Sequence, residues 1–329
     1  MSEEQTTHQL IVDTAVKIFT DHCDKPLLDR AEKGEFPDAL WQQITENGFD
    51  QLGSVSSGTS VQDMFAFVQQ CGRFAVPMPI ADTLLVNRWC ESESAAATAT
   101  GGGLYAIGLV NGSEVIEVPW GRRADKVLAV QQGSHEVRVI ENPEVIKLDT
   151  NLAGEPRDSV VCPADAEVLH VAVDPYAQLA VARINLMAGS LQALLDLGLQ
   201  FANEREQFGR AIAKFQAIQH SLAVVASEVA VSRRAADAAV DAMDTERFLF
   251  EVAASKARVG EAVTIVAERV HQVHGAMGFT HEHRLHHFSR RAWAWRDEYG
   301  NEFYWQTLLG AHLAKLGPDR LWPFIATRD

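Results

Sequence analysis

Hydrophobic positions in the C-terminal half of the chain recur at helical spacing over long stretches without internal proline. Apolar residues three and four positions apart run from about residue 175 to 206, from Phe215 onward, and again up to His274. Gly275 follows the last segment, and glycine ends helices readily because left-handed backbone angles cost it little. Residues 175–329 therefore predict a four-helix bundle, although helical spacing alone would also fit an unrelated all-helical protein.

Residues 1–95 predict a domain of short helices. Pro37 stands at the start of one apolar segment, a place where a helix tolerates proline. Ser60 and Asp63 resemble a capping box with Asp in place of Glu, and an apolar run follows them. The stretch 92–103 is rich in Ala, Thr, Ser and Gly, which is typical of a linker.

The middle region, residues 96–174, has the pattern of a β domain. Its apolar runs are short, rich in β-branched residues and bounded by turn residues, which favours strands. The runs are residues 104–110, 113–118, 126–130 and 136–140. A small antiparallel sheet or barrel is expected, so the fold class is α+β with three domains.

Composition narrows the choice of partners and compartment. The 329 residues carry a net charge of −15, which argues against nucleic acid and anionic membranes as partners. The four cysteines are dispersed, which favours reduced thiols in a cytoplasmic protein. The N-terminus lacks the basic and apolar regions of a signal peptide, and no apolar run is long enough to span a membrane.

The stretch 204–220 joins the first two long helical segments and carries candidate binding chemistry. Gly209 predicts a helix stop, so a tight corner between two helices is expected. Arginine offers a forked, permanently charged donor suited to phosphate oxygens, and glutamine offers both a donor and an acceptor. The positions of interest are Arg205, Phe208, Gly209, Ile212, Phe215, Gln216 and Gln219.

These positions resemble the acyl-CoA dehydrogenase family, in which an Arg-x-x-Phe-Gly run is followed by Ile-x-x-Phe-Gln-x-x-Gln. The resemblance implies the fold of that family, with an N-terminal helical domain, a small middle β-domain and a C-terminal four-helix bundle. It also implies that FAD is the cofactor and that Arg205, Phe208 and Gln216 help to bind it. In the family, the arginine and the first glutamine reach the pyrophosphate and ribityl region of FAD in a neighbouring subunit.

A second stretch, residues 272–280, resembles the family's Gln-x-x-Gly-Gly-x-Gly-Phe loop. The resemblance implies that this loop binds the adenosine end of FAD in the neighbouring subunit. Ala276 replaces one of the family's glycines. The residues expected to contact the cofactor are Gln272, Val273, Gly275, Ala276 and Gly278.

Four histidines follow this loop at positions 281, 283, 286 and 287. Histidine is a common metal ligand, but the spacing fits no zinc pattern and no cysteine lies nearby. We therefore assign no metal site from the sequence and expect solvated histidines or histidines at a subunit contact.

Two family features are missing. The middle region lacks the Thr-Glu-Pro-x-Ala-Gly-Ser-Asp loop and the Trp-Ile-Thr-Asn strand that hold the flavin in relatives. The family's catalytic base is Glu in a Tyr-Glu-Gly-Thr run, and here Tyr299 occupies that position. Tyrosine is a poor base for removing the α-proton of an acyl-CoA thioester. The catalytic base is therefore unknown, with Glu298 as the fallback and Asp297 and Glu302 as further acids nearby.

This combination resembles the short subunits of the α2β2 heterotetrameric acyl-CoA dehydrogenases of bacterial steroid side-chain degradation. The leading hypothesis is a subunit that completes the FAD site of a homologous, base-bearing partner during α,β-desaturation of an acyl-CoA. A steroid side-chain CoA ester is one candidate substrate. The alternatives are a homo-oligomeric enzyme that uses an acid near residues 297–302, and a scaffold subunit without flavin. The sequence does not specify the acyl chain.

Overall fold

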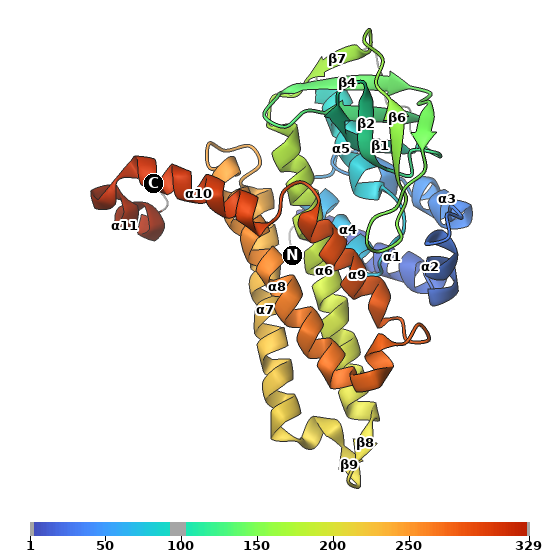
Figure 1. Ribbon diagram of the computed structural model, residues 1–329, viewed down its shortest axis with the longest axis vertical. Helices are drawn as coiled ribbons and strands as arrows, with labels where there is room; N and C mark the ends of the chain where they lie inside the picture. The colour runs from blue at the N-terminus through green and yellow to red at the C-terminus, as the bar shows by residue number, and fades with distance from the viewer. Residues whose placement is uncertain (1–2, 93–102, 328–329) are drawn as a thin grey trace.

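The computed structural model describes residues 3–92 and 103–327, which form N-terminal helices, a β-sheet and C-terminal helices (Figure 1). The mixed α+β class is confirmed. The expected linker at 92–103 lies almost wholly outside the described residues. No helix in the described part of the chain is both long and apolar enough to cross a membrane.

Five α-helices and a short 3-10 helix build the N-terminal part. They are α1 (Glu3–His22), α2 (Lys25–Ala31), α3 (Asp38–Glu46), η1 (Phe49–Gln51), α4 (Val61–Arg73) and α5 (Ile80–Ser92). The predicted capping box is confirmed: the Ser60 side chain accepts from the Asp63 backbone, and the Asp63 side chain accepts from Ser60.

The middle region is a seven-stranded sheet in the order β5-β6-β2-β1-β3-β4-β7. The strands are β1 (Tyr105–Asn111), β2 (Glu114–Pro119), β3 (Lys126–Val130), β4 (Glu136–Glu141), β5 (Val145–Lys147), β6 (Arg157–Val161) and β7 (Glu167–His170). The expectation of an antiparallel sheet needs a correction, because β1 and β3 pair in parallel, with Ile107 opposite Leu128. β2 ends at the edge of the sheet where β1 begins, and β3 starts at that same edge on the far side of β1, with Lys126 opposite Tyr105, so it runs parallel to β1.

The C-terminal helices α6 (Pro175–Glu204), α7 (Gln216–Asp241), α8 (Phe248–His274) and α9 (Leu285–Asp297) form the bundle. Two further helices, α10 (Glu302–Leu316) and α11 (Pro318–Thr327), project from its side (Figure 1). α6 is the central helix, because it packs against α7, α8 and α9 and against α4 of the N-terminal part. Gly275 ends α8 with a φ of 58°, as the sequence predicts.

Glycines allow α4 and α6 to cross very closely. A Cβ atom on Gly72 would lie 2.1 Å from the Leu186 carbonyl oxygen. A Cβ atom on Gly189 would lie 1.9 Å from the Gln69 carbonyl oxygen. Both distances are far below van der Waals contact, so neither position accepts a larger residue without separating the helices.

The corner between α6 and α7 differs from the predicted helix–helix turn. α6 ends at Glu204, and the chain then forms a small hairpin of β8 (Glu206–Gln207) and β9 (Arg210–Ala211), followed by the 3-10 helix η2 (Ile212–Lys214). Phe208 and Gly209 form the turn, with φ angles of 55° and 77°. Gly209 does adopt the expected left-handed backbone, but it serves a two-residue hairpin turn of the kind that requires positive φ at both positions.

Candidate functional site

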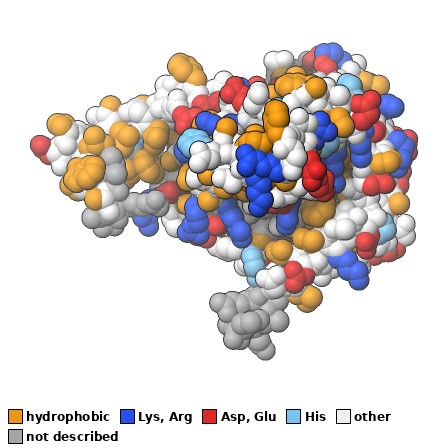
Figure 2. Space-filling model, turned by 90° about the horizontal axis from the view of Figure 1, so that it is seen from below, with side chains coloured by type: hydrophobic (Ala, Val, Ile, Leu, Met, Phe, Trp, Pro, Cys, Tyr) orange, Lys and Arg blue, Asp and Glu red, His pale blue; other side chains and the backbone are white. Residues whose placement is uncertain are grey.

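The residues predicted to contact a cofactor lie at the end of the bundle that carries the β8–β9 hairpin (Figure 1). α6 ends there, α7 begins there, and α8 ends there in the 3-10 helix η3 (Gly275–Phe279). Beneath the surface a small apolar cluster joins these segments. It contains Ala202, Leu222 and Val273, with Phe201, Ile212, Ala213 and Ile218 packed against it. Seen from this end, basic and hydrophobic side chains lie beside one another (Figure 2).

Arg205 is held by its backbone and left free at its side chain. Its N–H donates to Phe201 O at 2.9 Å, and its carbonyl accepts from Ile212 N at 2.8 Å. The side chain is exposed and has no hydrogen bond or ion pair with any residue in the described ranges. An exposed guanidinium on a fixed backbone is ready to bind an anionic group from another molecule.

Phe208 is 91 % exposed at the tip of the hairpin. Its ring lies edge-on to Phe215 with a centroid distance of 6.1 Å, and the Arg210 guanidinium lies 4.3 Å from the centroid of Phe215. A positive φ on a bulky residue is costly, so Phe208 combines backbone strain with an apolar surface that is open to solvent. Strained backbone positions of this kind cluster at binding sites.

Gln216 is the first residue of α7 and is exposed. The N-cap position, Phe215, makes no side-chain capping bond. Ile218 and Gln219 donate their N–H groups to Phe215 O, whereas the N–H groups of Gln216 and Ala217 have no hydrogen bond among the described residues. These two groups and the positive end of the dipole of a 26-residue helix are therefore at the surface beside Gln216. Together with Arg205, this arrangement offers donors suited to a phosphate or pyrophosphate.

The second predicted loop lies beside an apolar cavity of about 470 Å³. Gln272 is exposed and lines this cavity with Gly278, whereas Val273 is buried in the apolar cluster. Gly275 and Ala276 are exposed. A Cβ on Gly278 would lie 3.0 Å from the Cβ of His274, so a side chain there would crowd the loop. The cavity can receive a flat, mostly apolar group with one edge that hydrogen-bonds to Gln272.

A second region of interest lies between the sheet and the end of α9, and it contains the acids that the sequence offers as candidate bases. Glu298 is 10 % exposed and accepts from Arg183 Nε at 2.6 Å and Arg157 Nε at 2.9 Å. Asn151 Nδ2 donates to the same carboxylate at 3.1 Å. Burial alone would raise the pKa of Glu298, but Arg157 and Arg183 outweigh it and lower the pKa to about 2. A carboxylate held in this way is a weak proton acceptor.

Tyr299, which the sequence resemblance aligns with the family's base, is buried. Its hydroxyl donates to Ile107 O at 3.3 Å, and the Arg183 guanidinium lies 4.9 Å from its ring centroid. Burial raises the pKa of the phenol well above its usual value. Tyr299 also has a φ of 55°, and its carbonyl accepts from Trp305 Nε1. These contacts make Tyr299 a structural residue at neutral pH.

The other acids near this position also have basic partners. Asp297 is exposed, and both Asp297 and Glu302 lie 3.4 Å from Arg296 Nε. A cleft of about 460 Å³ opens between Asp297 and the sheet, and polar or charged side chains form much of its wall. Its polar lining includes Glu117, Lys147, Asp149, Asn151, Arg157, Ser159 and Glu298.

Sequence reasoning missed the residues that hold Glu298. Arg183 stands inside an apolar run of α6 and is 3 % exposed, and Arg157 opens strand β6 at 9 % exposed. Arg183 also pairs with the buried Asp82 at 3.1 Å, and Arg157 with Glu155 at 3.2 Å. A charged residue within an apolar helix face was the available signal for Arg183, since such residues are buried only with partners.

Comparisons with known proteins agree with this architecture. Residues 175–301 match the family model of the acyl-CoA dehydrogenase C-terminal domain. Acyl-CoA dehydrogenase IpdE2 from Mycobacterium tuberculosis is 25 % identical over 86 % of this chain and 90 % of its own length. Among solved structures, a chain of the ChsE4-ChsE5 complex from Mycobacterium tuberculosis superposes with a TM-score of 0.85 at 18 % identity, covering 97 % of this chain and 99 % of that one. A chain of the Tcur3481-Tcur3483 steroid ACAD superposes with a TM-score of 0.84 at 18 % identity, covering 95 % and 99 %.

Proposed function

We propose that this chain, whose residues 175–301 match the acyl-CoA dehydrogenase C-terminal domain, is a subunit of an acyl-CoA dehydrogenase that completes the FAD site of a homologous, base-bearing partner. FAD, when bound, accepts the hydride that leaves the substrate. In this proposal Arg205, Phe208, Gln216 and the loop at 272–278 serve the partner's cofactor. The chain's own cleft beside Glu298 does not carry out the reaction.

The bundle end suits the outer part of FAD. Arg205 and the uncapped start of α7 provide positive charge for a pyrophosphate in a protein that is otherwise strongly acidic. The cavity next to Gln272 and Gly278 is mostly apolar and of a size to receive an adenine ring. These groups face outward, so a cofactor bound there needs a second subunit to cover its other side.

The cleft beside Glu298 suits a flavin ring poorly. Glu117, Arg157 and Glu298 lie on its wall, and a flat ring placed against them would displace water from charged groups without pairing them. The observation that carries the proposal is the ion pairing of Glu298 with Arg157 and Arg183, because it makes the acid next to Tyr299, the first candidate to replace the missing base, a weak proton acceptor.

The partner and the substrate class are also part of the proposal. Two similar folds come from a ChsE4-ChsE5 complex and from a Tcur3481-Tcur3483 steroid ACAD, both of which pair two different chains. We infer by analogy a heterotetramer with a homologous subunit and an acyl-CoA substrate, with a steroid side-chain CoA ester as the first to test. A homo-oligomeric enzyme using Asp297 or Glu302 and a scaffold without flavin remain the competing hypotheses.

Flavin stoichiometry tests the proposal. The chain would be purified alone and co-expressed with a homologue that carries the Tyr-Glu-Gly-Thr run. We expect a colourless chain alone, about one FAD per heterodimer in the complex, and bleaching of that flavin by acyl-CoA. A chain that binds one FAD by itself and is bleached by acyl-CoA would overturn the proposal in favour of the homo-oligomeric enzyme. A complex without flavin would favour the scaffold.

A further inference from the structure

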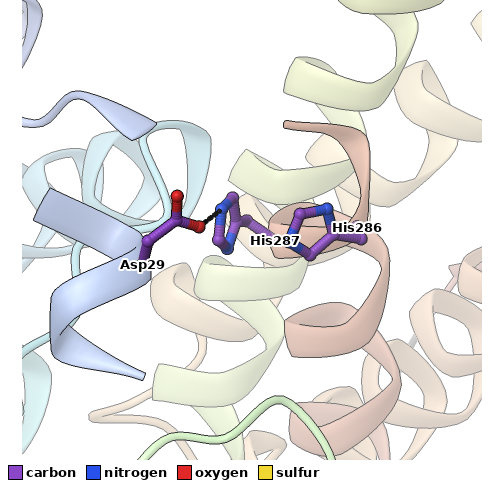
Figure 3. A group of neighbouring side chains, drawn as sticks. All are labelled: Asp29, His286 and His287. Atoms are coloured by element: carbon purple, nitrogen blue, oxygen red, sulfur yellow. Dashed lines mark ion pairs between the residues drawn. The ribbon is translucent and has the colours of Figure 1, made fainter. Parts of the chain in front are cut away.

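Three side chains from distant parts of the sequence meet where the N-terminal helices contact the bundle. Asp29 lies on α2, and His286 and His287 lie at the start of α9 (Figure 3). Each can offer one ligand atom, and these three atoms lie within 4.8 Å of one another. Asp29 and His286 are partly exposed, so the group is open to solvent on one side, while His287 is fully buried.

His287 has one nitrogen engaged and one nitrogen without a hydrogen bond. Its Nδ1 lies 2.6 Å from Glu32 Oε1, and a carboxylate can only accept, so Nδ1 carries a proton. Its buried Nε2 has no hydrogen-bond partner among the described residues, although Asp29 Oδ1 lies 3.1 Å away. In the neutral ring this Nε2 carries a lone pair that faces a carboxylate oxygen. A cation bound between these two atoms would stabilise both.

In His286, as in His287, Nδ1 lies at hydrogen-bond distance from an oxygen acceptor. The Nδ1 of His286 lies 2.8 Å from the backbone carbonyl of His283, so Nδ1 is the donor and Nε2 keeps the lone pair. Histidines that bind metals almost always donate their other N–H to a carboxylate or a backbone carbonyl, and both supports are present here.

We propose that Asp29, His286 and His287 bind a divalent transition metal of the Zn²⁺ class. Two imidazole nitrogens and one carboxylate oxygen are typical ligands for this class, and the solvent side leaves room for water as a further ligand. Lys25 pairs with the other Asp29 oxygen at 2.6 Å, and Arg290 and Arg291 lie 3.4 Å from Glu32. These positive charges reduce the affinity below that of a structural zinc site.

The bound metal would tie α2 to α9 and so connect the N-terminal helices to the segment that follows the loop at 272–280. Of its three ligands only His286 also lines the cavity proposed for the adenine ring. Metal uptake by the isolated chain without FAD, and its loss in Asp29→Asn, therefore test this proposal separately from the proposed cofactor role. The proposal also goes against the sequence-based expectation of no metal site. That expectation rested on the linear spacing of the histidines, which cannot reveal Asp29 as a third ligand.

Metal uptake by the full chain tests the proposal. Chelator-treated protein would be titrated at neutral pH with Zn²⁺ by calorimetry and with Co²⁺ by visible absorption. We expect about one metal ion per chain and a Co²⁺ spectrum of low coordination number. His286→Gln and Asp29→Asn should each weaken binding by at least about ten-fold, as loss of a ligand does. Both positions are partly exposed, and unchanged circular dichroism and melting temperature would establish that these variants fold.

His220→Gln is the matched control, because His220 is an exposed histidine at the start of α7, away from α2 and α9. It should bind metal as the unsubstituted chain does. Equal uptake by the unsubstituted chain and by His286→Gln, or no uptake by either, would overturn the proposal.

Discussion

Arginine side chains are exposed and unpaired in one region of this molecule and buried in ion pairs in another. At the bundle end, Arg205 has a fixed backbone and a free, exposed guanidinium. Beside the sheet, Arg157 and Arg183 are buried and pair with Glu298, Glu155 and Asp82. The difference shows which region can still bind something. A free guanidinium can bind a ligand at little cost, whereas a ligand for the buried pair must first break ion pairs.

The same contrast extends to the backbone. Phe208 and Tyr299 both have positive φ angles, of 55° each. Phe208 places its ring in solvent, and Tyr299 packs its ring beneath Arg183. Strain at Phe208 therefore presents a surface, while strain at Tyr299 is compensated by internal contacts.

The largest expected effect is the loss of the Glu298 carboxylate. Glu298→Ala leaves Arg157 and Arg183 buried without their shared partner, and should lower the free energy of unfolding by about 3–5 kcal/mol. Chemical denaturation measures this. Asp297→Ala is the neighbouring control, expected within about 0.5 kcal/mol because Asp297 is exposed. A similar small loss in both variants would show that the buried network is not structural.

Acid should weaken the same network. The pKa of Glu298 is about 2 in the folded chain, against an ordinary value of 4.5. Because the pKa of Glu298 is lower in the folded chain than in the unfolded chain, the ionised carboxylate stabilises the fold by about 3 kcal/mol at pH values above the unfolded pKa. This stabilisation is lost as the pH falls from about 4.5 towards 2. Glu298→Gln should show a shallower loss of stability over this range in denaturation curves taken at several pH values. An identical slope in both proteins would contradict the assignment.

Arg205→Ala should act on the cofactor without acting on the fold. In the complex with the partner, loss of one charged hydrogen-bond donor is expected to weaken FAD retention by about ten- to a hundred-fold. The melting temperature of the isolated chain should not change. Arg210→Ala is the control, since Arg210 is exposed on the same hairpin but already packs on Phe215. Equal flavin loss in both variants would point to a general charge effect.

The smallest expected effect comes from the hairpin turn. Gly209 has a φ of 77°, and a Cβ atom added to it would have no other atom within 4 Å. Gly209→Ala therefore adds only backbone strain, which should lower the free energy of unfolding by about 1 kcal/mol. Denaturation of the isolated chain measures it. Gly310→Ala is the opposite control, because Gly310 lies inside α10 with open space and should stabilise by up to about 1 kcal/mol. A neutral Gly209→Ala would mean that the turn adjusts freely.

Sequence patterns predict the long elements of this fold well. Four of the strands and the long C-terminal helices follow from apolar periodicity, and the Ser60–Asp63 cap and the Gly275 stop from local chemistry. Strands β5 and β7 were missed because they are only three and four residues long, whereas β6 is as long as β3 but begins with the charged pair Arg157 and Asp158. Those charges are buried by partners far along the chain, which no local pattern contains.

The candidate sites likewise contain residues that short sequence motifs identify and residues that only the fold brings together. Arg205, Gln216 and Gln272 could be chosen from short motifs, and their cofactor role stays a prediction. The state of Glu298 could not be predicted, because it depends on Arg157 from the sheet and Arg183 from α6. Likewise, His286 and His287 were visible in the sequence, whereas Asp29 is brought to them only by the packing of α2 on α9.

The close crossing of α4 and α6 limits how this protein could be recombined with its relatives. Gly72 and Gly189 leave no clearance between the two backbones, so each helix accepts only a partner shaped for it. A chimera that joins the N-terminal helices of one relative to the bundle of another would place a foreign surface against one of these glycines. We expect functional hybrids only when α4 and α6 come from the same parent protein, so these two helices should be exchanged together.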